Sequence, residues 1–499
     1  MRSLLFLKKK SLQDKPVDWR AEGEKRAIAL FHEMSLRVPA YKKFLAERNF
    51  LPSSVKNMKD FKTIPVIDKD NYLRKYSREE LSWDGAFPAG GWSISTTSGS
   101  TGVPYYFPRQ NSQDQAYADM AEKYLRRNFK IQERKTLYIV AFPMGAWIGG
   151  VFTYEALSRI AQKGSYDLSI ITPGINTQEI INCIKELSND YEQIIIGAYA
   201  PFLKDILDTG ARQGIRWRKI KLGFVFSAEA FSETFRDYIL QTVGAKNKYT
   251  ATLNHYGTVD MGTMAHETPL SILVRRKMYE KEFQYDVLPK DNRQPTLCQY
   301  DPREYFFEQE DGYNLYCSSN AGFPLVRYDL KDFGGIVSYE SISDIFDAKK
   351  HNLAQLCERS SIDYETQPFV YVYERNDMSV GYYAFRVYPD AIRRAIFAAN
   401  LHATALTGKF SVESSYTEKG NQKLTVHVEM QEGVKRDQFT KRYLTKLFHE
   451  ALLSDSSEYS ETFKMLGSIV KPHVAMHEYG TERYFKVGTK QKWTVKDTQ

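Results

Sequence analysis

Short apolar runs alternate with helical patterns between residues 136 and 240, and this alternation constrains the fold more than any other feature. Strands are expected at 136–142, 169–172, 193–196 and 221–226, and helices at 113–129, at 177–187 and after residue 232. Strands that alternate with helices form parallel sheets with the helices packed on their faces. The sequence therefore predicts an α/β fold.

The two ends of the chain add further elements. A helical pattern covers residues 20–50, and Val38-Pro39 ends it because proline does not continue a helix. A strand at 424–430 and a helix at 438–453 suit a small α+β domain. A chain of 499 residues exceeds the size at which one core usually splits, so two or more domains are expected.

A stretch rich in hydroxyl groups and glycine lies between two short extended runs. Glycines let backbone N–H groups approach a ligand closely, and hydroxyl groups donate further hydrogen bonds to an anion, so the stretch suits an oligophosphate. It lacks the lysine of a Walker A loop. A surface linker is the alternative. The stretch contains Thr97, Ser98, Gly99, Ser100, Thr101 and Gly102.

Composition limits the kinds of partner. A net charge of +8 over 499 residues is modest; it favours anionic ligands such as ATP or CoA, and no concentrated basic arm points to nucleic acid. The four cysteines are widely spaced, which predicts neither a zinc knuckle nor a disulfide framework and fits a cytoplasmic protein. No run approaches the roughly 18 apolar residues of a membrane helix, so no membrane span is expected.

The sequence Thr-Ser-Gly-Ser-Thr-Gly-Val-Pro at 97–104 resembles the phosphate loop of the adenylate-forming superfamily, which includes acyl-CoA synthetases, adenylation domains and luciferases. Three further motifs follow in the family's order, at 256–260, 327–332 and 375–377. The runs at 38–45 and 61–70 resemble a narrower branch, the phenylacetate–CoA ligase-like and capsule-biosynthesis-like proteins. The resemblance covers nearly the whole chain.

This resemblance implies an ATP site. The hydroxyl-rich stretch would hold the phosphates, and the turn after the strand at 221–226 would present its backbone to adenine. A plain helix N-cap at Ser227 is the alternative for that turn. Asp332 would accept both ribose hydroxyls, and Arg327 would support the phosphates or the loop. Besides 97–102, the implied ATP-binding residues are Ser227, Ala228, Glu229, Tyr256, Gly257, Arg327, Asp332 and Arg375.

Two residues are implied in catalysis. Asp260 would help to hold Mg²⁺, which takes one or two protein carboxylates; Val259 replaces the family's usual hydroxyl residue, and Asp260 is one methylene shorter than the usual glutamate. Lys490 would neutralise charge on the carboxylate and α-phosphate, with Lys486 and Lys492 as alternatives. His266 is expected to be a solvated or hydrogen-bonded histidine.

The resemblance also implies a domain division. A large ATP- and carboxylate-binding domain would span 1–374, and a small mobile lid would span 375–499, with Asp377 as the hinge residue and Glu374 in place of the usual glycine. Phe142, Trp147 and Tyr199 would line the pocket for an apolar or aromatic acid. The alternative for Phe142 and Trp147 is an ordinary core position.

The implied reaction converts Mg²⁺-ATP and a small carboxylate into an acyl-adenylate, and the acyl group then passes to CoA as co-substrate. An amine acceptor is the alternative. A non-catalytic nucleotide-binding protein is a further alternative, supported by the departures at Val259, Asp260 and Glu374. The acid and the oligomeric state stay open, with a homodimer as one alternative.

Overall fold

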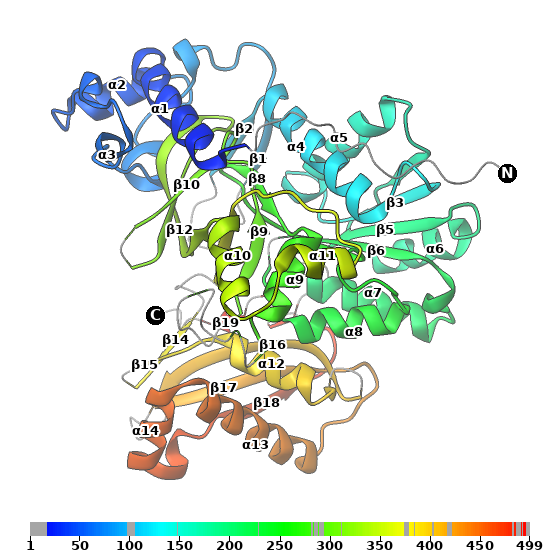
Figure 1. Ribbon diagram of the computed structural model, residues 1–499. Helices are drawn as coiled ribbons and strands as arrows, with labels where there is room; N and C mark the ends of the chain where they lie inside the picture. Colours follow the sequence, from blue (N-terminus) through cyan, green and yellow to red (C-terminus); the bar gives the residue numbers. More distant parts are fainter. Residues whose placement is uncertain are drawn as a thin grey trace.

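The computed structural model describes most of the chain (Figure 1). The described residues are 17–96, 105–146, 148–227, 229–280, 283, 288, 294–310, 312–373, 379–383, 385–401, 404–416, 422–481, 484–485, 491 and 493–495.

The N-terminal helical pattern forms two helices rather than one. Helix α1 (Trp19–Arg37) ends at Val38, and α2 (Pro39–Ala46) begins with the proline. Proline suits the first position of a helix because the N–H that it lacks would have no partner there. Helix α3 (Met58–Phe61) and a π-helical turn (Lys69–Leu73) follow. The interruption predicted at Val38-Pro39 is confirmed.

Next comes a two-stranded antiparallel pair, β1 (Ser93–Thr96) and β2 (Tyr106–Arg109), in which Thr96 lies opposite Tyr106. These strands are the two extended runs that flank the hydroxyl-rich stretch. The pairing therefore brings together the described residues on either side of 97–104.

The centre of the molecule is an 11-stranded mixed sheet. The four strands predicted for the parallel part are confirmed: β4, β3, β5 and β6 pair in parallel in this spatial order, and β7, which was not predicted, joins β6 in parallel. From β7 onward the neighbours are antiparallel. In spatial order the strands are β10 (Phe306–Gln309), β11 (Asn314–Asn320), β12 (Pro324–Val337), β13 (Phe369–Val372), β9 (Thr296–Gln299), β8 (Gly262–His266), β7 (Thr252–Thr258), β6 (Leu222–Ser227), β5 (Gln193–Ala198), β3 (Thr136–Ala141) and β4 (Leu168–Ile171).

Helices cover both faces of the parallel part. Alternate side chains of one strand point to opposite faces, so Ile139 packs with α6, α7 and α8 while Tyr138 packs with α4 and α5. Further along the chain, α9, α10 and α11 pack together on the antiparallel part. The bounds are α4 (Asn111–Tyr124), α5 (Ile148–Gln162), α6 (Thr177–Leu187), α7 (Ala200–Arg212), α8 (Glu233–Val243), α9 (Pro269–Lys277), α10 (Tyr339–Ala348) and α11 (Leu353–Arg359).

The helix cap expected at Ser227 is wrong. Ser227 belongs to β6 and pairs with His255 of β7. The N-cap of α8 is Ser232, whose hydroxyl accepts a hydrogen bond from the N–H of Phe235 at 3.2 Å. Residues 229–231 therefore lie between the carboxyl end of β6 and α8, at the edge where open α/β sheets bind ligands.

A second, smaller sheet lies near the C-terminal end of the chain (Figure 1). Its spatial order is β18, β17, β16, β19, and its apolar face packs on α12 and α13. The predicted boundary between residues 374 and 375 falls at a stretch outside the described residues. The bounds are β14 (Val380–Tyr382), β15 (Phe385–Val387), α12 (Pro389–Ala398), β16 (Leu406–Tyr416), β17 (Gln422–Met430), α13 (Gln438–Asp455), α14 (Ser457–Leu466), β18 (His473–His477) and β19 (Thr494–Val495).

The C-terminal part contacts helices of the large part in two places. Helix α12 packs on α8, and the polar face of the small sheet contacts α7. Phe397 of α12 packs on Phe235 of α8, with ring centroids 5.2 Å apart. Within the described ranges, no helix is both long enough and apolar enough to cross a membrane.

Candidate functional site

Two of the predicted motifs meet at a hydrogen bond. The Tyr256 hydroxyl, on β7, donates to Oδ2 of Asp332, on β12, at 2.8 Å, although 76 residues separate them. Both residues are buried. Burial, together with the Asp332 carboxylate, raises the pKa of Tyr256 well above its usual value. The phenol therefore stays protonated and holds the carboxylate in place.

Asp260, which follows soon after Tyr256 in the sequence, makes a second set of polar contacts. The Tyr328 hydroxyl donates to its Oδ2, and Lys69 Nζ lies 3.5 Å from the same oxygen. Lys69 is the first residue of the π-helical turn and lies within the run at 61–70, but no sequence motif assigns it a role. A carboxylate suits Mg²⁺, so the donor type at Asp260 fits. The described residues hold no group of three or more His, Cys, Asp or Glu placed to bind a metal ion, so most ligands would have to come from phosphates and water.

Gly257 follows Tyr256 at the end of β7. A Cβ at this position would lie 2.4 Å from the carbonyl oxygen of Gly262. The two strands approach so closely here that only glycine fits, and the backbone of Gly257 stays exposed at the end of the strand.

The loop after β6 contains Glu229, which is 7% exposed. Its backbone carbonyl accepts a hydrogen bond from Nδ2 of Asn254, on β7, at 3.0 Å. Its Oε1 accepts a hydrogen bond from the backbone N–H of Gln491 at 2.9 Å. Gln491 lies between Lys490 and Lys492 in the sequence, so this contact brings the C-terminal segment to the loop predicted to face adenine.

Arg327 is buried and has many protein partners. Its guanidinium donates to Glu308, to Glu310 and to the backbone carbonyls of Lys62 and Ile64, at distances from 2.5 to 3.2 Å. These contacts tie residues 62–64 to β10 and β12. None of these partners belongs to the hydroxyl-rich stretch, so both roles given to Arg327, support of the phosphates or of the loop, stay predictions.

Two of the three predicted pocket residues are in contact. The rings of Phe142 and Tyr199 lie 5.4 Å apart in an edge-on arrangement at the carboxyl ends of β3 and β5. Burial, with the nearby Glu229 carboxylate, raises the pKa of Tyr199 to about 12. The Tyr199 hydroxyl therefore stays protonated at neutral pH.

Several predicted site residues fall outside the described part of the chain, and their roles stay predictions. They are Thr97, Ser98, Gly99, Ser100, Thr101, Gly102, Trp147, Ala228, Arg375, Asp377 and Lys490.

His266 is a buried, hydrogen-bonded residue, as one of its two alternatives predicted. Its Nε2 lies 2.9 Å from Nη2 of Arg127, which donates to it. Burial, reinforced by the Arg127 charge, lowers the pKa of His266 well below its usual value, so the imidazole is neutral.

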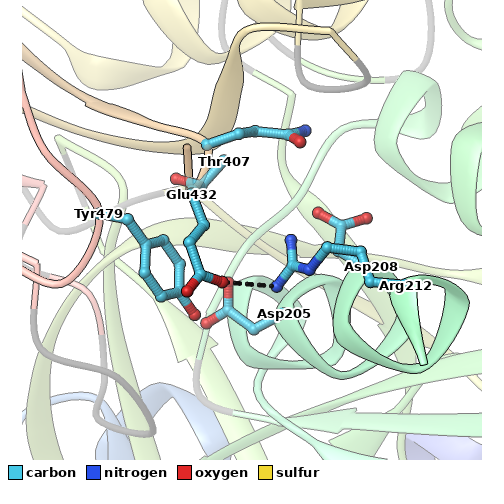
Figure 2. A pocket seen from close by; sticks show the side chains of 7 residues that line it. Asp205, Asp208, Arg212, Thr407, Glu432 and Tyr479 are labelled. Carbon is cyan, nitrogen blue, oxygen red and sulfur yellow. Dashed lines mark ion pairs between the residues drawn. The ribbon is translucent and has the colours of Figure 1, made fainter. Parts of the chain in front are cut away.

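A small pocket lies between α7 and the small sheet (Figure 2). Asp205, Asp208 and Arg212 line it from α7, and Thr407, Glu432 and Tyr479 line it from the C-terminal part. Arg212 and Glu432 form an ion pair of 3.3 Å across it. The two parts of the protein therefore meet through charged side chains as well as through Phe397.

Comparison with known proteins gives a match in structure only. No model of a protein family matches the chain, and no curated protein matches it in sequence. Among solved structures, 2-hydroxyisobutyryl-CoA ligase in its postadenylation state, in complex with R3-HIB-AMP, matches with a TM-score of 0.64 and 14% identity, over 99% of this chain and 95% of that one. The chain therefore shares the fold of this ligase.

Two further structures agree with this assignment. The GH3.15 acyl acid amido synthetase matches with a TM-score of 0.59 and 13% identity, over 96% of this chain and 92% of that one. The same 2-hydroxyisobutyryl-CoA ligase with 2-HIB-AMP and CoA, in its thioesterification state, matches with a TM-score of 0.50 and 15% identity, over 98% of this chain and 95% of that one. At these identities the likeness concerns the fold alone.

Proposed function

We propose that this protein is an ATP-dependent ligase that activates a small carboxylate as an acyl-adenylate. The observation that carries the proposal is the hydrogen bond between Tyr256 and Asp332, because it joins the residue predicted to face adenine to the residue predicted to bind the ribose. The loop that contains Glu229 begins beside them, since Ser227 pairs with His255. The fold is that of enzymes crystallised with acyl-adenylates.

In the first step, a carboxylate oxygen of the acid attacks the α-phosphorus of ATP and pyrophosphate leaves. Asp332 accepts hydrogen bonds from the ribose hydroxyls, which fixes the nucleotide. Asp260 is the protein carboxylate for Mg²⁺, which supplies charge neutralisation at the phosphates. Lys490 supplies a further positive charge where negative charge develops.

In the second step, an acceptor attacks the carbonyl carbon of the acyl-adenylate and AMP leaves. We propose the thiol of CoA as the acceptor and an amine as the alternative. Structures of both a CoA ligase and an amido synthetase match the fold, so the fold does not separate the two. Phe142 and Tyr199 favour an apolar or aromatic acid.

The acceptor can be tested by trapping. With an acid that supports pyrophosphate release, hydroxylamine alone should give the hydroxamate, and CoA should give an acyl-CoA thioester that mass spectrometry detects. Hydroxamate without any thioester would reject CoA and favour the amine alternative. Use of an acid labelled with ¹⁸O in its carboxylate adds a check on the route, because attack through that oxygen leaves one ¹⁸O in the AMP.

A non-catalytic nucleotide-binding protein is the competing proposal. The ion pair between Lys69 and Asp260 supports it, because the lysine charge competes with a metal ion for that carboxylate. Calorimetry would favour this alternative if ATP binds tightly while a broad panel of acids releases no pyrophosphate.

A further inference from the structure

Glu229 contacts a residue that is far from it in the chain. Its Oε1 accepts the backbone N–H of Gln491 at 2.9 Å, across a separation of 262 residues. Glu229 is 7% exposed and Gln491 is 5% exposed, so water competes little for this hydrogen bond. A carboxylate that accepts from a buried N–H makes one of the stronger hydrogen bonds in proteins.

The large part of the protein holds Glu229 from its other side. Asn254, which is 2% exposed on β7, donates from Nδ2 to the Glu229 carbonyl at 3.0 Å. Asn254 is two residues from Tyr256 in the same strand. The position of the Glu229 backbone is therefore set by the strand that carries the proposed adenine site.

The small sheet holds Gln491 and residues 493–495. Nε2 of Gln491 donates to the Phe410 carbonyl at 3.2 Å, and the N–H of Val412 donates to the Trp493 carbonyl at 2.8 Å. The Trp493 ring packs between Arg393 and Phe410. Strand β19 then pairs in parallel with β16. This C-terminal segment, Gln491 with residues 493–495, is thus part of the small sheet. Its hydrogen bond to the loop after β6 is the one that the N–H of Gln491 donates to Glu229.

We propose that Glu229 is a positioning residue that docks the C-terminal segment onto the loop after β6 by accepting the N–H of Gln491. Gln491 lies between Lys490 and Lys492 in the sequence, and the contact fixes the Gln491 backbone relative to the loop predicted to face adenine. The hydrogen bond joins the two parts of the protein, so any rotation that separates them breaks it. The inference rests on the proposed function for its role in catalysis, but the contact itself can be tested without a substrate.

Hydrogen exchange of the full-length protein tests the contact directly. A peptide that contains Gln491 should exchange more than tenfold faster in Glu229→Ala than in the wild type, while the Val412 amide, which bonds within the small sheet, should be unchanged. Glu229→Gln keeps an acceptor oxygen at the same reach and should protect Gln491 like the wild type. Glu229→Asp keeps the charge but is one methylene shorter, so it should behave like Glu229→Ala.

Glu432→Ala is the matched control, because Glu432 is an acid at the same interface that pairs with Arg212 away from this segment. It should leave exchange at Gln491 unchanged. Equal exchange in the wild type, Glu229→Ala and Glu229→Asp would overturn the proposal. Protection by aspartate but not by glutamine would also overturn it, because charge rather than this hydrogen bond would then be responsible.

Kinetics test the consequence for the reaction. Glu229→Ala and Glu229→Asp should slow acid-dependent pyrophosphate release at least tenfold, with a smaller loss in Glu229→Gln, and transfer from a supplied acyl-adenylate should fall by less than pyrophosphate release does in each variant. Equal losses in both half-reactions would overturn the positioning role. If exchange at Gln491 responds as expected while no acid releases pyrophosphate, the contact stands and the proposed function fails.

Discussion

Lys409 of β16 and Asp205 of α7 form an ion pair of 2.5 Å between the small sheet and a helix of the large part of the protein. Their side chains are 4% and 3% exposed, and Glu429 of β17 lies 3.6 Å from the same ammonium. Burial acts to lower the pKa of Lys409, but Asp205 and Glu429 outweigh it, so the pKa lies above its usual value. The lysine stays charged and joins the small sheet to Asp205 of α7, which lines the pocket of Figure 2.

Removal of this lysine should loosen the contact between the two parts. Lys409→Met leaves Asp205 buried without its cation, and the loss of one partner from a buried pair costs about 3–5 kcal/mol. Urea unfolding should show a lower midpoint, and Asp205→Asn added to Lys409→Met should restore much of it. Arg212→Met is the control, because Arg212 and Glu432 are 44% and 62% exposed and such a pair contributes at most about 1 kcal/mol. Equal effects of the two single variants would contradict the role given to Lys409.

Arg236 should be essential for the stability of the loop after β6. It is fully buried, and its guanidinium bonds to Glu233 of α8, to Thr252 of β7 and to Glu267. Arg236→Met leaves two buried carboxylates with one cation fewer and should cost about 3–5 kcal/mol of unfolding free energy. The exposed ion pair of Arg20 with Glu24 offers a control, and Arg20→Met should leave the unfolding midpoint unchanged. A small effect of Arg236→Met would show that Arg275, which also bonds to Glu233, suffices alone.

His255 should make the protein less stable in acid. It is buried against Tyr117 and Tyr124, and burial lowers its pKa to about 3. Between pH 6.5 and 3 the unfolded chain binds a proton at this position that the folded protein does not bind. Stability therefore rises with pH in this window and is lost as pH falls through it, by about 1.4 kcal/mol per pH unit for one proton.

The test is the slope of unfolding free energy against pH in the wild type and in His255→Phe, measured by urea unfolding from pH 4 to 6.5. The variant should show a slope smaller by one proton. Identical slopes would mean that His255 is protonated in the folded protein or is not buried in solution.

Tyr256 should matter for nucleotide affinity through Asp332. Tyr256→Phe removes the hydroxyl that orients the carboxylate, and a hydrogen bond to a charged group contributes about 1.5–3 kcal/mol. We expect a roughly tenfold to hundredfold higher Kd for ATP by calorimetry. Tyr305→Phe is the control, since its buried hydroxyl donates to the Met261 carbonyl instead. Equal ATP affinity in the wild type and Tyr256→Phe would remove the support for a ribose site at Asp332.

The sequence predicted four strands of the parallel part from their own periodicity, but it did not predict α5, α7 or β7. Helix α6 spans the residues expected for it, and the strand ends differ by one or two residues. The N-cap of α8 was misplaced because Ser227 and Ser232 carry the same local signal, and only the pairing of Ser227 with His255 separates them.

The contacts between the two parts could not be predicted from the sequence. Asp205 and Lys409 are 204 residues apart, and no local pattern marks either as a partner of the other. The same holds for Glu229 with Gln491, and for Lys69 with Asp260. The motifs predicted which residues belong to one site. The charged side chains that hold these residues in place, such as Lys69, come from distant parts of the chain and depend on how the whole chain packs.

Acid-dependent pyrophosphate release from Mg²⁺-ATP, measured over a panel of aryl, fatty and amino acids, tests the central claim most directly. We predict release with at least one acid, a fall of roughly 10²–10³-fold in Lys490→Ala, as expected for loss of one preorganised charge, and a strong fall in Asp332→Ala. Binding of ATP without release for any acid, or release that is equal in the wild type and both variants, would contradict the proposal that this protein forms acyl-adenylates at this site.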